Sequence, residues 1–230
     1  MDKVLAELRR YDSPTICNAL ERMNIRPLEQ GFLSPGNTCQ TKGGPFIGFA
    51  STAKYATAEP STQSLSNSEY YSHILATPRP SITVIEDIDA PSCGAIWGEV
   101  MAHSHATLGS IALVTNGLVR DVDALAEISF GCFAAGMSPS RAYAHLVEHG
   151  TPVTIGNLCI HPGDILFCDK NGIVNIPKEA LADIIEACEK IIWAEEDILE
   201  YCKRHLAEGL EADLDKLMEH TVELAKRRKV

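Results

Sequence analysis

Two short motifs carry the side chains best suited to chemistry. They are Gly98-Glu99-Val100-Met101-Ala102 and, some twenty residues later, Val119-Arg120-Asp121-Val122-Asp123. A glycine lets a ligand approach the backbone, and the first N–H groups of a predicted helix at residues 99–101 suit a carboxylate. Arginine can bind a carboxylate through two parallel hydrogen bonds, and aspartate oxygens suit Mg²⁺ or Mn²⁺. Together the two motifs could hold a divalent metal beside a small oxo acid.

Each motif also has a purely structural explanation. Glu99 could simply stabilise the positive end of a helix dipole. Arg120 and Asp121 could form surface ion pairs, with Asp123 and Glu127 as the neighbouring acids. The sequence motifs, taken one at a time, leave both interpretations open.

Two histidines follow Glu99 on its predicted helix. His103 lies four residues after Glu99, so it could face the site as a ligand or a proton shuttle. His103 and His105 could equally be ordinary histidines that are buried with a partner or face solvent. Their role is left open.

The C-terminal segment supplies a further acid. An apolar stripe at helical spacing runs through residues 181–202, and Glu195 falls on this stripe with Glu196 beside it. A carboxylate on a packed helix face is costly unless it is paired or lies near a metal. Glu195 is therefore a candidate site residue, although it could also reach solvent at the edge of the stripe.

Alternating strands and helices would position these motifs. A strand over residues 94–97 leads into Gly98, and a helix follows from Glu99 to Leu108. A buried strand over 111–115 and a turn at Asn116-Gly117 would place Arg120 and Asp121 at the edge of the same sheet. This order predicts an α/β class with a mixed sheet and a βαβ core over about 81–135.

The remaining elements are predicted from periodicity and turn residues. Residues 31–45 and 56–68 are predicted to be loops, and residues from 178 onward to be helical with a break at Gly209. The other predicted helices are 2–10, 15–23 and 123–128, and the other predicted strands are 46–55, 81–85, 132–135, 152–155, 158–160, 164–168 and 172–176.

Composition excludes several classes of function. The 230 residues carry a net charge of −11, which argues against binding to a nucleic-acid backbone, and the basic run at 226–229 is interpreted as a solvated helix end. No stretch approaches eighteen apolar residues and the N-terminus lacks the apolar core of a signal peptide, so no membrane association is expected. Eight cysteines without a CxxC motif or zinc-site spacing favour free thiols in the cytoplasm.

The combination of motifs resembles a known family. Besides the two central motifs, Pro162-Gly163-Asp164-Ile165 and residues 169–174 look like the RraA-like family, which contains class II 4-hydroxy-4-methyl-2-oxoglutarate and 4-carboxy-4-hydroxy-2-oxoadipate aldolases and also inhibitors of ribonuclease E. The resemblance covers about residues 10–180. It implies a swivelling α/β/β fold with a sandwich-like core and a mixed sheet. It also implies that the chain is divided into a catalytic domain over 1–177 and a helical extension over 178–230.

The resemblance also implies a metal site that contains Mg²⁺ or Mn²⁺. Asp121 would bind the metal directly, and Glu99 would hold it through a water. Glu195, with Glu196 as the fallback, would reach the metal through a water from the C-terminal helix of a neighbouring subunit. The family implies homotrimers or homohexamers in which such a contact can form.

The implied activity is cleavage of a 4-hydroxy-2-oxo acid to pyruvate and a second oxo acid, with oxaloacetate decarboxylation as a side activity. Arg120 would bind the oxo acid, and the backbone of Gly98, Glu99, Val100 and Met101 would cradle its carboxylate. The alternatives are a protein-binding regulator of ribonuclease activity, and a related lyase or hydratase for another hydroxy-oxo acid.

This chain departs from the family pattern in several places. Asn18 and Asn116 stand where the family often has aspartate, and His103 and His105 stand where small or basic residues are usual. The loop at 56–68 and the tail after residue 205 are also individual. None of these departures removes a residue of the expected metal centre, whereas the part of the pocket that binds the distal end of the substrate is expected to differ.

Overall fold

A mixed β-sheet forms the centre of the molecule. The computed structural model describes residues 2–33, 38–61, 65–89 and 91–228. The strands in this part of the chain are β1 (Thr38–Cys39), β2 (Phe46–Ala56), β3 (Ser81–Asp87), β4 (Ala95–Trp97), β5 (Ser110–Thr115), β6 (Leu118–Val119), β7 (Gly131–Ala134), β8 (Gly136–Met137), β9 (His145–His149), β10 (Val153–Ile155), β11 (Leu158–Ile160), β12 (Ile165–Asp169) and β13 (Gly172–Ile176).

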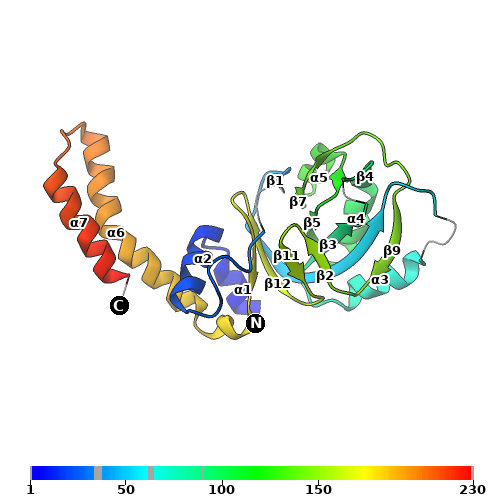
Figure 1. The fold of residues 1–230 in the computed structure, drawn as a ribbon, viewed down its shortest axis with the longest axis horizontal. Coiled ribbons are helices and arrows are strands. Elements are labelled where there is room, and N and C mark those ends of the chain that lie inside the picture. Colours follow the sequence, from blue (N-terminus) through cyan, green and yellow to red (C-terminus); the bar gives the residue numbers. More distant parts are fainter. Residues whose placement is uncertain (1, 34–37, 62–64, 90, 229–230) are drawn as a thin grey trace.

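Helices lie at both ends of this sheet (Figure 1). They are α1 (Asp2–Leu8), α2 (Ser13–Arg22), α3 (Asn67–Ala76), α4 (Glu99–Thr107), α5 (Val122–Glu127), the 3₁₀ helix η1 (Lys178–Ala182), α6 (Ile184–Glu208) and α7 (Leu214–Arg227). Among the described helices, none combines the length and the apolar character that a membrane span requires.

Three sheets share the strands. The large sheet has the order β1-β7-β5-β3-β2-β12-β13, with β9 also paired to β2. Its central strands β2, β3, β5 and β7 run parallel, whereas β1, β9, β12 and β13 pair antiparallel. The strands β4, β6 and β8 form a separate parallel sheet, and β10 and β11 form an antiparallel hairpin.

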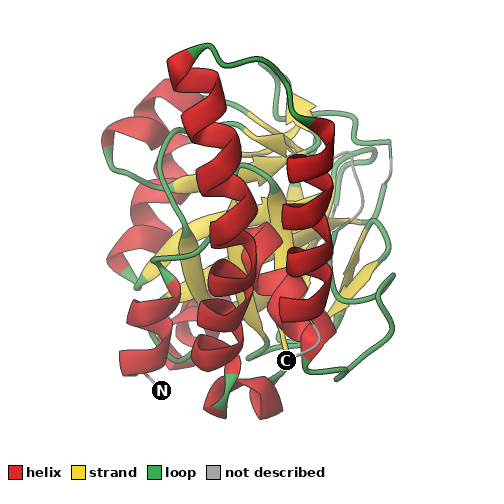
Figure 2. Ribbon diagram, turned by 90° about the vertical axis from the view of Figure 1, so that its left-hand side faces the viewer, coloured by secondary structure: helices red, strands yellow, loops and turns green. Residues whose placement is uncertain are grey.

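Alternate residues of β2 face different layers. Ile47 and Phe49 pack with α1, α2 and the start of α6, and Tyr55, farther along the same face, packs with residues of α3 and α4. Phe46 and Ala50 point to the other face, where the β10–β11 hairpin covers them. Figure 2 shows helices in front of the sheet. Helices on one face and a small β layer on the other confirm the predicted α/β/β architecture.

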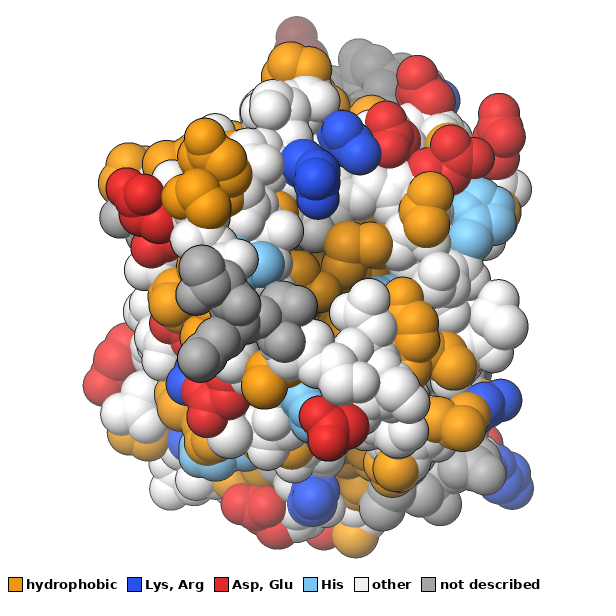
Figure 3. Space-filling view, turned by 90° about the vertical axis from the view of Figure 1, so that its right-hand side faces the viewer, with side chains coloured by type: hydrophobic (Ala, Val, Ile, Leu, Met, Phe, Trp, Pro, Cys, Tyr) orange, Lys and Arg blue, Asp and Glu red, His pale blue; other side chains and the backbone are white. Residues whose placement is uncertain are grey.

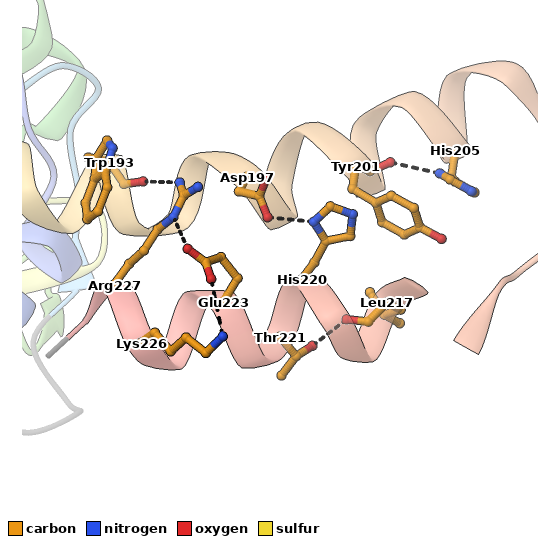
Figure 4. Close-up of polar contacts among 10 residues, drawn as sticks. All are labelled: Trp193, Asp197, Tyr201, His205, Leu217, His220, Thr221, Glu223, Lys226 and Arg227. Carbon is orange, nitrogen blue, oxygen red and sulfur yellow. Dashed lines mark hydrogen bonds and ion pairs between the residues drawn. The ribbon is translucent and has the colours of Figure 1, made fainter. Parts of the chain in front are cut away.

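The C-terminal helices form a hairpin that projects from the body (Figure 1). Gly209 ends α6 in the left-handed conformation at φ +61°, which favours glycine and confirms the predicted break. In Figure 4, His220 on α7 donates to Asp197 on α6 at 2.6 Å, and this hydrogen bond lowers the pKa of Asp197. The Arg227 guanidinium lies 4.8 Å from the centre of the Trp193 ring. Polar and ring contacts therefore hold the two helices together, since α7 buries none of its described side chains.

Two of the longer elements, α3 and β9, were not predicted, and neither were the two-residue strands β1, β6 and β8, of which β1 lies within the predicted loop over 31–45. Helix α3 begins at Asn67, inside the predicted loop over 56–68, and continues through a stretch with no predicted element; it buries only Tyr70 and Ile74 and shows little apolar periodicity. Strand β9 was also unassigned, and only Leu146 of its residues is buried. Both elements are held by neighbours distant in the sequence, so their local pattern carries little signal.

The N-terminus of α2 depends on an acid 156 residues away. The carboxylate of Asp169, which is buried, accepts hydrogen bonds from the Ser13 N–H at 2.8 Å, the Ser13 hydroxyl at 2.7 Å and the Asn171 N–H at 2.8 Å. We expect Asp169→Ala to lower the free energy of unfolding by about 3 kcal/mol, because it leaves buried donors without an acceptor. Urea titration measures this change. Glu211→Gln, at an exposed acid, is the control, and an equal effect of both variants would contradict the prediction.

Candidate active site

The parallel pairing of two very short strands creates the site. Strand β4 pairs with β6 through Ala95 with Leu118 and Trp97 with Val119. The Arg120 N–H extends this pairing by donating to the Trp97 carbonyl at 3.0 Å. Because both strands run in the same direction, the residues that follow them lie side by side. The two chemical motifs therefore meet at the carboxyl ends of β4 and β6.

The supporting sheet differs from the predicted one. Arg120 and Asp121 were expected at the edge of the sheet that contains the strand over 111–115, but the structure places them after β6 in the separate small sheet. The chain leaves the main sheet at Asn116, whose side-chain amide accepts from the Asp87 N–H at 2.7 Å and donates to the Asp87 carbonyl at 2.9 Å. A two-residue strand such as β6 has too little pattern to be predicted.

Asp121 adopts an unusual conformation. Its φ of +58° lies in the left-handed region, which asparagine and aspartate tolerate better than other non-glycine residues. It occupies the N-cap of α5, yet its side chain makes no capping hydrogen bond to that helix. Instead, Oδ2 accepts from the Glu99 N–H at 3.1 Å, at the N-terminus of α4. The carboxylate is thus directed across the site rather than toward its own helix.

Gly98 leaves the space that this carboxylate occupies. A Cβ atom at position 98 would lie 2.6 Å from Asp121 Oδ2 and 3.1 Å from Arg120 Nε. The backbone of Gly98 is extended, at φ −162°, so glycine is needed here for close approach and not for conformation. The Glu99 N–H is taken by Asp121, which leaves the N–H groups of Val100 and Met101 as the helix donors that face the pocket without a partner among the described residues.

A pocket of about 220 Å³ opens beside these groups. Arg120 is directed by two acceptors, since its Nε lies 3.6 Å from Asp121 Oδ2 and its Nη1 donates to the Pro139 carbonyl at 3.4 Å. Figure 3 shows two basic side chains together at the rim of a hollow with an apolar floor. The pocket is lined by Tyr55, Ala95, Ile96, Trp97, Gly98, Glu99, Val100, Met101, Arg120, Asp121, Arg141 and Ala144.

Several of these lining residues were not predicted from the sequence. Trp97 directly precedes Gly98, so its place was foreseeable once the strand was assigned. Tyr55 comes from the end of β2, and Arg141 comes from a loop that long-range hydrogen bonds position. No local sequence signal could have linked Tyr55 or Arg141 to the two motifs.

The two histidines of α4 have different environments. His103 is exposed, and its Nδ1 lies 3.0 Å from the Glu99 carbonyl, outside the residues that line the pocket. His105 is fully buried beneath the helix, where Nδ1 donates to the Met101 carbonyl at 2.7 Å and Nε2 accepts from the Tyr70 hydroxyl at 3.0 Å. Burial lowers the pKa of His105 to about 4. His105 is therefore a neutral residue that supports α4 from below.

The predicted acids of the C-terminal helix lie far from the pocket in space. Glu195 and Glu196 are on α6, on the opposite side of the molecule from α4 and α5 (Figure 1). Glu195 pairs with Arg228 at 2.9 Å and its side chain is 30% exposed, whereas Glu196 is exposed. A single chain therefore does not bring either acid to Asp121.

Glu99 and Asp121 are the carboxylates available to a metal ion in this pocket. Within the described ranges, no group of three or more histidine, cysteine, aspartate or glutamate side chains could hold a metal ion. Mg²⁺ in proteins commonly binds one or two carboxylates and keeps several waters. The donor set therefore fits an ion that the protein holds by few ligands, and not a closed site made of protein groups alone.

A family model described as Aldolase/RraA, for RraA-like proteins, matches residues 13–175. The chain belongs to the RraA-like family. Its two central motifs, Gly98-Glu99 and Arg120-Asp121, both lie within the matched segment. The resemblance inferred from these motifs is thus confirmed.

Three similar proteins illustrate the range of this family. Protein DlpA of Legionella pneumophila is 29% identical over 200 residues, which are 86% of this chain and 31% of DlpA. A Pseudomonas syringae protein named "Putative 4-hydroxy-4-methyl-2-oxoglutarate aldolase" is 37% identical over 84 residues, 36% of this chain. The match spans 52% of that relative, so the chain aligns with only a third to a half of either relative's length.

The third is a solved structure. Streptomyces coelicolor RraAS2, described as an unusual member of the RNase ES inhibitor RraA protein family, aligns with a TM-score of 0.67 at 20% identity. The alignment covers 84% of this chain and 94% of RraAS2. At this identity the likeness shows a shared fold.

The low pKa of His105 predicts a pH dependence of stability. Its pKa is about 4 in the folded protein, against an ordinary 6.5, so the unfolded chain binds more protons between these values. We expect His105 to reduce stability by up to about 3 kcal/mol as the pH falls from 7 to 4. In His105→Gln this part of the pH dependence should disappear.

Urea titrations at several pH values measure the effect. His103→Gln is the matched control, since it removes an exposed histidine from the same helix. If both variants keep the acid sensitivity of the wild-type protein, His105 does not cause it.

Proposed function

We propose that the chain is a divalent-metal-dependent lyase that cleaves a 4-hydroxy-2-oxo acid to pyruvate and a second oxo acid, and that it also decarboxylates oxaloacetate. The observation that carries this proposal is the convergence of Glu99, Arg120 and Asp121 around one pocket. Membership of the RraA-like family and the name of the Pseudomonas syringae relative support it.

The residues present fit an Mg²⁺ or Mn²⁺ ion. Asp121 would hold it directly, because its carboxylate is directed into the site and its side chain is 42% exposed. Glu99 would hold it through a water. When bound, the ion supplies Lewis acidity that polarises the 2-oxo group of the substrate.

Arg120 and the start of α4 would bind the oxo-acid end of the substrate. The N–H groups of Val100 and Met101 point out of the helix N-terminus, where a carboxylate is stabilised by both hydrogen bonds and the helix dipole. Arg120 is held by Asp121 and Pro139, so it is oriented before substrate arrives. Its guanidinium can offset the negative charge that develops on the 2-oxo oxygen as the carbon–carbon bond breaks.

Cleavage also requires removal of a proton from the 4-hydroxyl group. The Glu99 carboxylate lines the pocket and, among the described residues, has no hydrogen-bond or ion-pair partner, so it can accept this proton directly or through a water. The 4-hydroxyl oxygen becomes the carbonyl of the second oxo acid, the bond between C3 and C4 breaks, and protonation of C3 completes pyruvate. In oxaloacetate, CO₂ leaves in place of the second oxo acid.

A third acid would come from a neighbouring subunit. We propose a homotrimer or homohexamer in which Glu195, or Glu196, approaches the metal of the next chain through a water. Glu195 would have to exchange its partner, since Arg228 of its own chain holds it.

Asp121→Asn tests the central role of this carboxylate. We expect a loss of pyruvate release of at least about 100-fold, because the variant keeps the size of the side chain but removes the anionic metal ligand. Pyruvate is followed with lactate dehydrogenase and NADH, from oxaloacetate and from 4-hydroxy-4-methyl-2-oxoglutarate, in Mg²⁺, Mn²⁺ or EDTA. Asp123→Asn, an exposed acid two residues away, should retain activity.

The same assay separates the alternatives. Release from oxaloacetate alone would indicate a related lyase or hydratase with another natural substrate. No metal-dependent release from either compound, together with a stoichiometric complex with a ribonuclease, would favour a protein-binding regulator. Wild-type activity in Asp121→Asn would contradict the proposed mechanism.

Gly98→Ala tests the close approach of the two motifs. The added methyl group would lie only 2.6 Å from Asp121 Oδ2, too close for a contact, and would push the carboxylate away from the Glu99 N–H. We expect turnover to fall at least about tenfold, while the melting temperature changes little because the backbone at position 98 is extended. Gly136→Ala, in β8 with its nearest contact at 3.3 Å, is a milder control. Full activity in Gly98→Ala would show that the close approach is not needed.

A further inference from the structure

Few side chains of the pocket can supply a proton to C3, the step that completes pyruvate. Apart from its two arginines, which stay protonated, the pocket is lined by three side chains with an ionisable group, Tyr55, Glu99 and Asp121. Asp121 is the proposed metal ligand, and Glu99 is the proposed acceptor of the 4-hydroxyl proton. Among the described residues of the lining, Tyr55 is therefore the side chain that enters the reaction with a proton to donate.

The hydroxyl of Tyr55 is free, although the residue is only 7% exposed. A buried tyrosine hydroxyl usually has a hydrogen-bond partner, but this one has none among the residues that the structure describes. It also differs from Trp97 Nε1 of the same pocket, which is fully enclosed and unpartnered. The Tyr55 hydroxyl keeps contact with solvent, and the face of Tyr55 that solvent reaches is the one that lines the pocket.

Two features fix the direction of the Tyr55 ring. The antiparallel pairing of β2 with β9 shifts register between Lys54 and Tyr55, and such bulges redirect side chains and are common beside active sites. The ring then packs edge-on against Tyr70, with ring centres 6.5 Å apart. Because the Tyr70 hydroxyl donates to His105 of α4, the ring of Tyr55 and the start of α4 share one support.

The surroundings of Tyr55 keep its hydroxyl protonated. Burial raises the pKa of Tyr55 above its ordinary value of 10.0, and the nearby hydroxyl of Tyr71 raises it further. The phenol is therefore neutral at pH 7, where an exposed carboxylate is ionised. A proton is thus present on this oxygen before a ligand enters.

We propose that Tyr55 is the catalytic acid that protonates C3 of the enolate left by carbon–carbon cleavage. This inference rests on the proposed function of the same pocket. The Tyr55 O–H bond breaks as the electron pair of the enolate forms the new C3–H bond. The proton that Glu99 has taken from the 4-hydroxyl group then passes through a water to the phenolate, so both side chains return to their starting states. Oxaloacetate has no 4-hydroxyl group, so with this substrate a proton from water restores Tyr55.

Hydrogen exchange at the methyl group of pyruvate isolates this step, because it is the protonation of C3 run in reverse and breaks no carbon–carbon bond. NMR in D₂O with Mg²⁺ follows the loss of the methyl signal. We expect Tyr55→Phe to slow this exchange at least about 100-fold, as for other losses of a general acid. The affinity for pyruvate, measured by calorimetry, and the melting temperature should change little, since the hydroxyl has no partner in the described protein.

Oxaloacetate provides a second readout, because it loses CO₂ before C3 is protonated. In Tyr55→Phe we expect the consumption of oxaloacetate to fall by a smaller factor than the methyl exchange, with the enol of pyruvate appearing transiently in the NMR spectrum. Tyr143→Phe is the matched control, since Tyr143 is 55% exposed and lies outside the lining of the pocket. It should keep both wild-type rates. An equal loss of exchange and of oxaloacetate consumption in Tyr55→Phe would overturn the inference, because it would show that Tyr55 only supports the pocket.

The proposed function is tested separately by the wild-type protein. If the wild-type protein releases pyruvate in a metal-dependent manner and Tyr55→Phe exchanges methyl hydrogens at the wild-type rate, only the role of Tyr55 is wrong. If the wild-type protein neither releases pyruvate nor exchanges its methyl hydrogens, both proposals are wrong.

Discussion

The parallel pairing of β4 with β6 is the constraint on which the site depends. Two strands of three and two residues bring together motifs that are separated by about twenty residues of helix and buried strand. The pairing sets only the backbone. Gly98 then allows the Asp121 carboxylate to approach, and the left-handed conformation of Asp121 turns that carboxylate toward the N-terminus of α4. Each of the three features would be ineffective without the other two.

The support beneath the pocket is apolar and neutral. Trp97 packs against His105 with ring centres 4.5 Å apart and against Phe130, and His105 links α4 to Tyr70 of α3. The charged groups lie on the solvent side of this layer. Such a division keeps the pocket floor rigid while the ionised side chains remain hydrated until a ligand enters. It also explains why a helix with little apolar periodicity, α3, has a place in the fold.

Much of the architecture could be predicted from the sequence because most long elements have strong local patterns. The apolar runs of β5 and β12 and the glycine after α6 each act through neighbours in the sequence. Glu99, Arg120 and Asp121 could be identified by residue type and motif. The small sheet, α3 and β9 could not, since their positions depend on contacts between distant segments. Arg141 belongs to the same group, because only the folded loop brings it to the pocket.

The amide of Asn116 has a consequence for the ends of the central strands. Asn116 both donates to and accepts from the backbone of Asp87, and so joins the end of β5 to the end of β3. Aspartate at this position could make only one of these hydrogen bonds while ionised, and would add a second acid beside the buried carboxylate of Asp87. With an amide, the two hydrogen bonds that join β5 to β3 where the chain departs toward β6 involve no group that gains or loses a proton. The alignment of these strand ends by Asn116 is therefore independent of the protonation of the acids in the pocket.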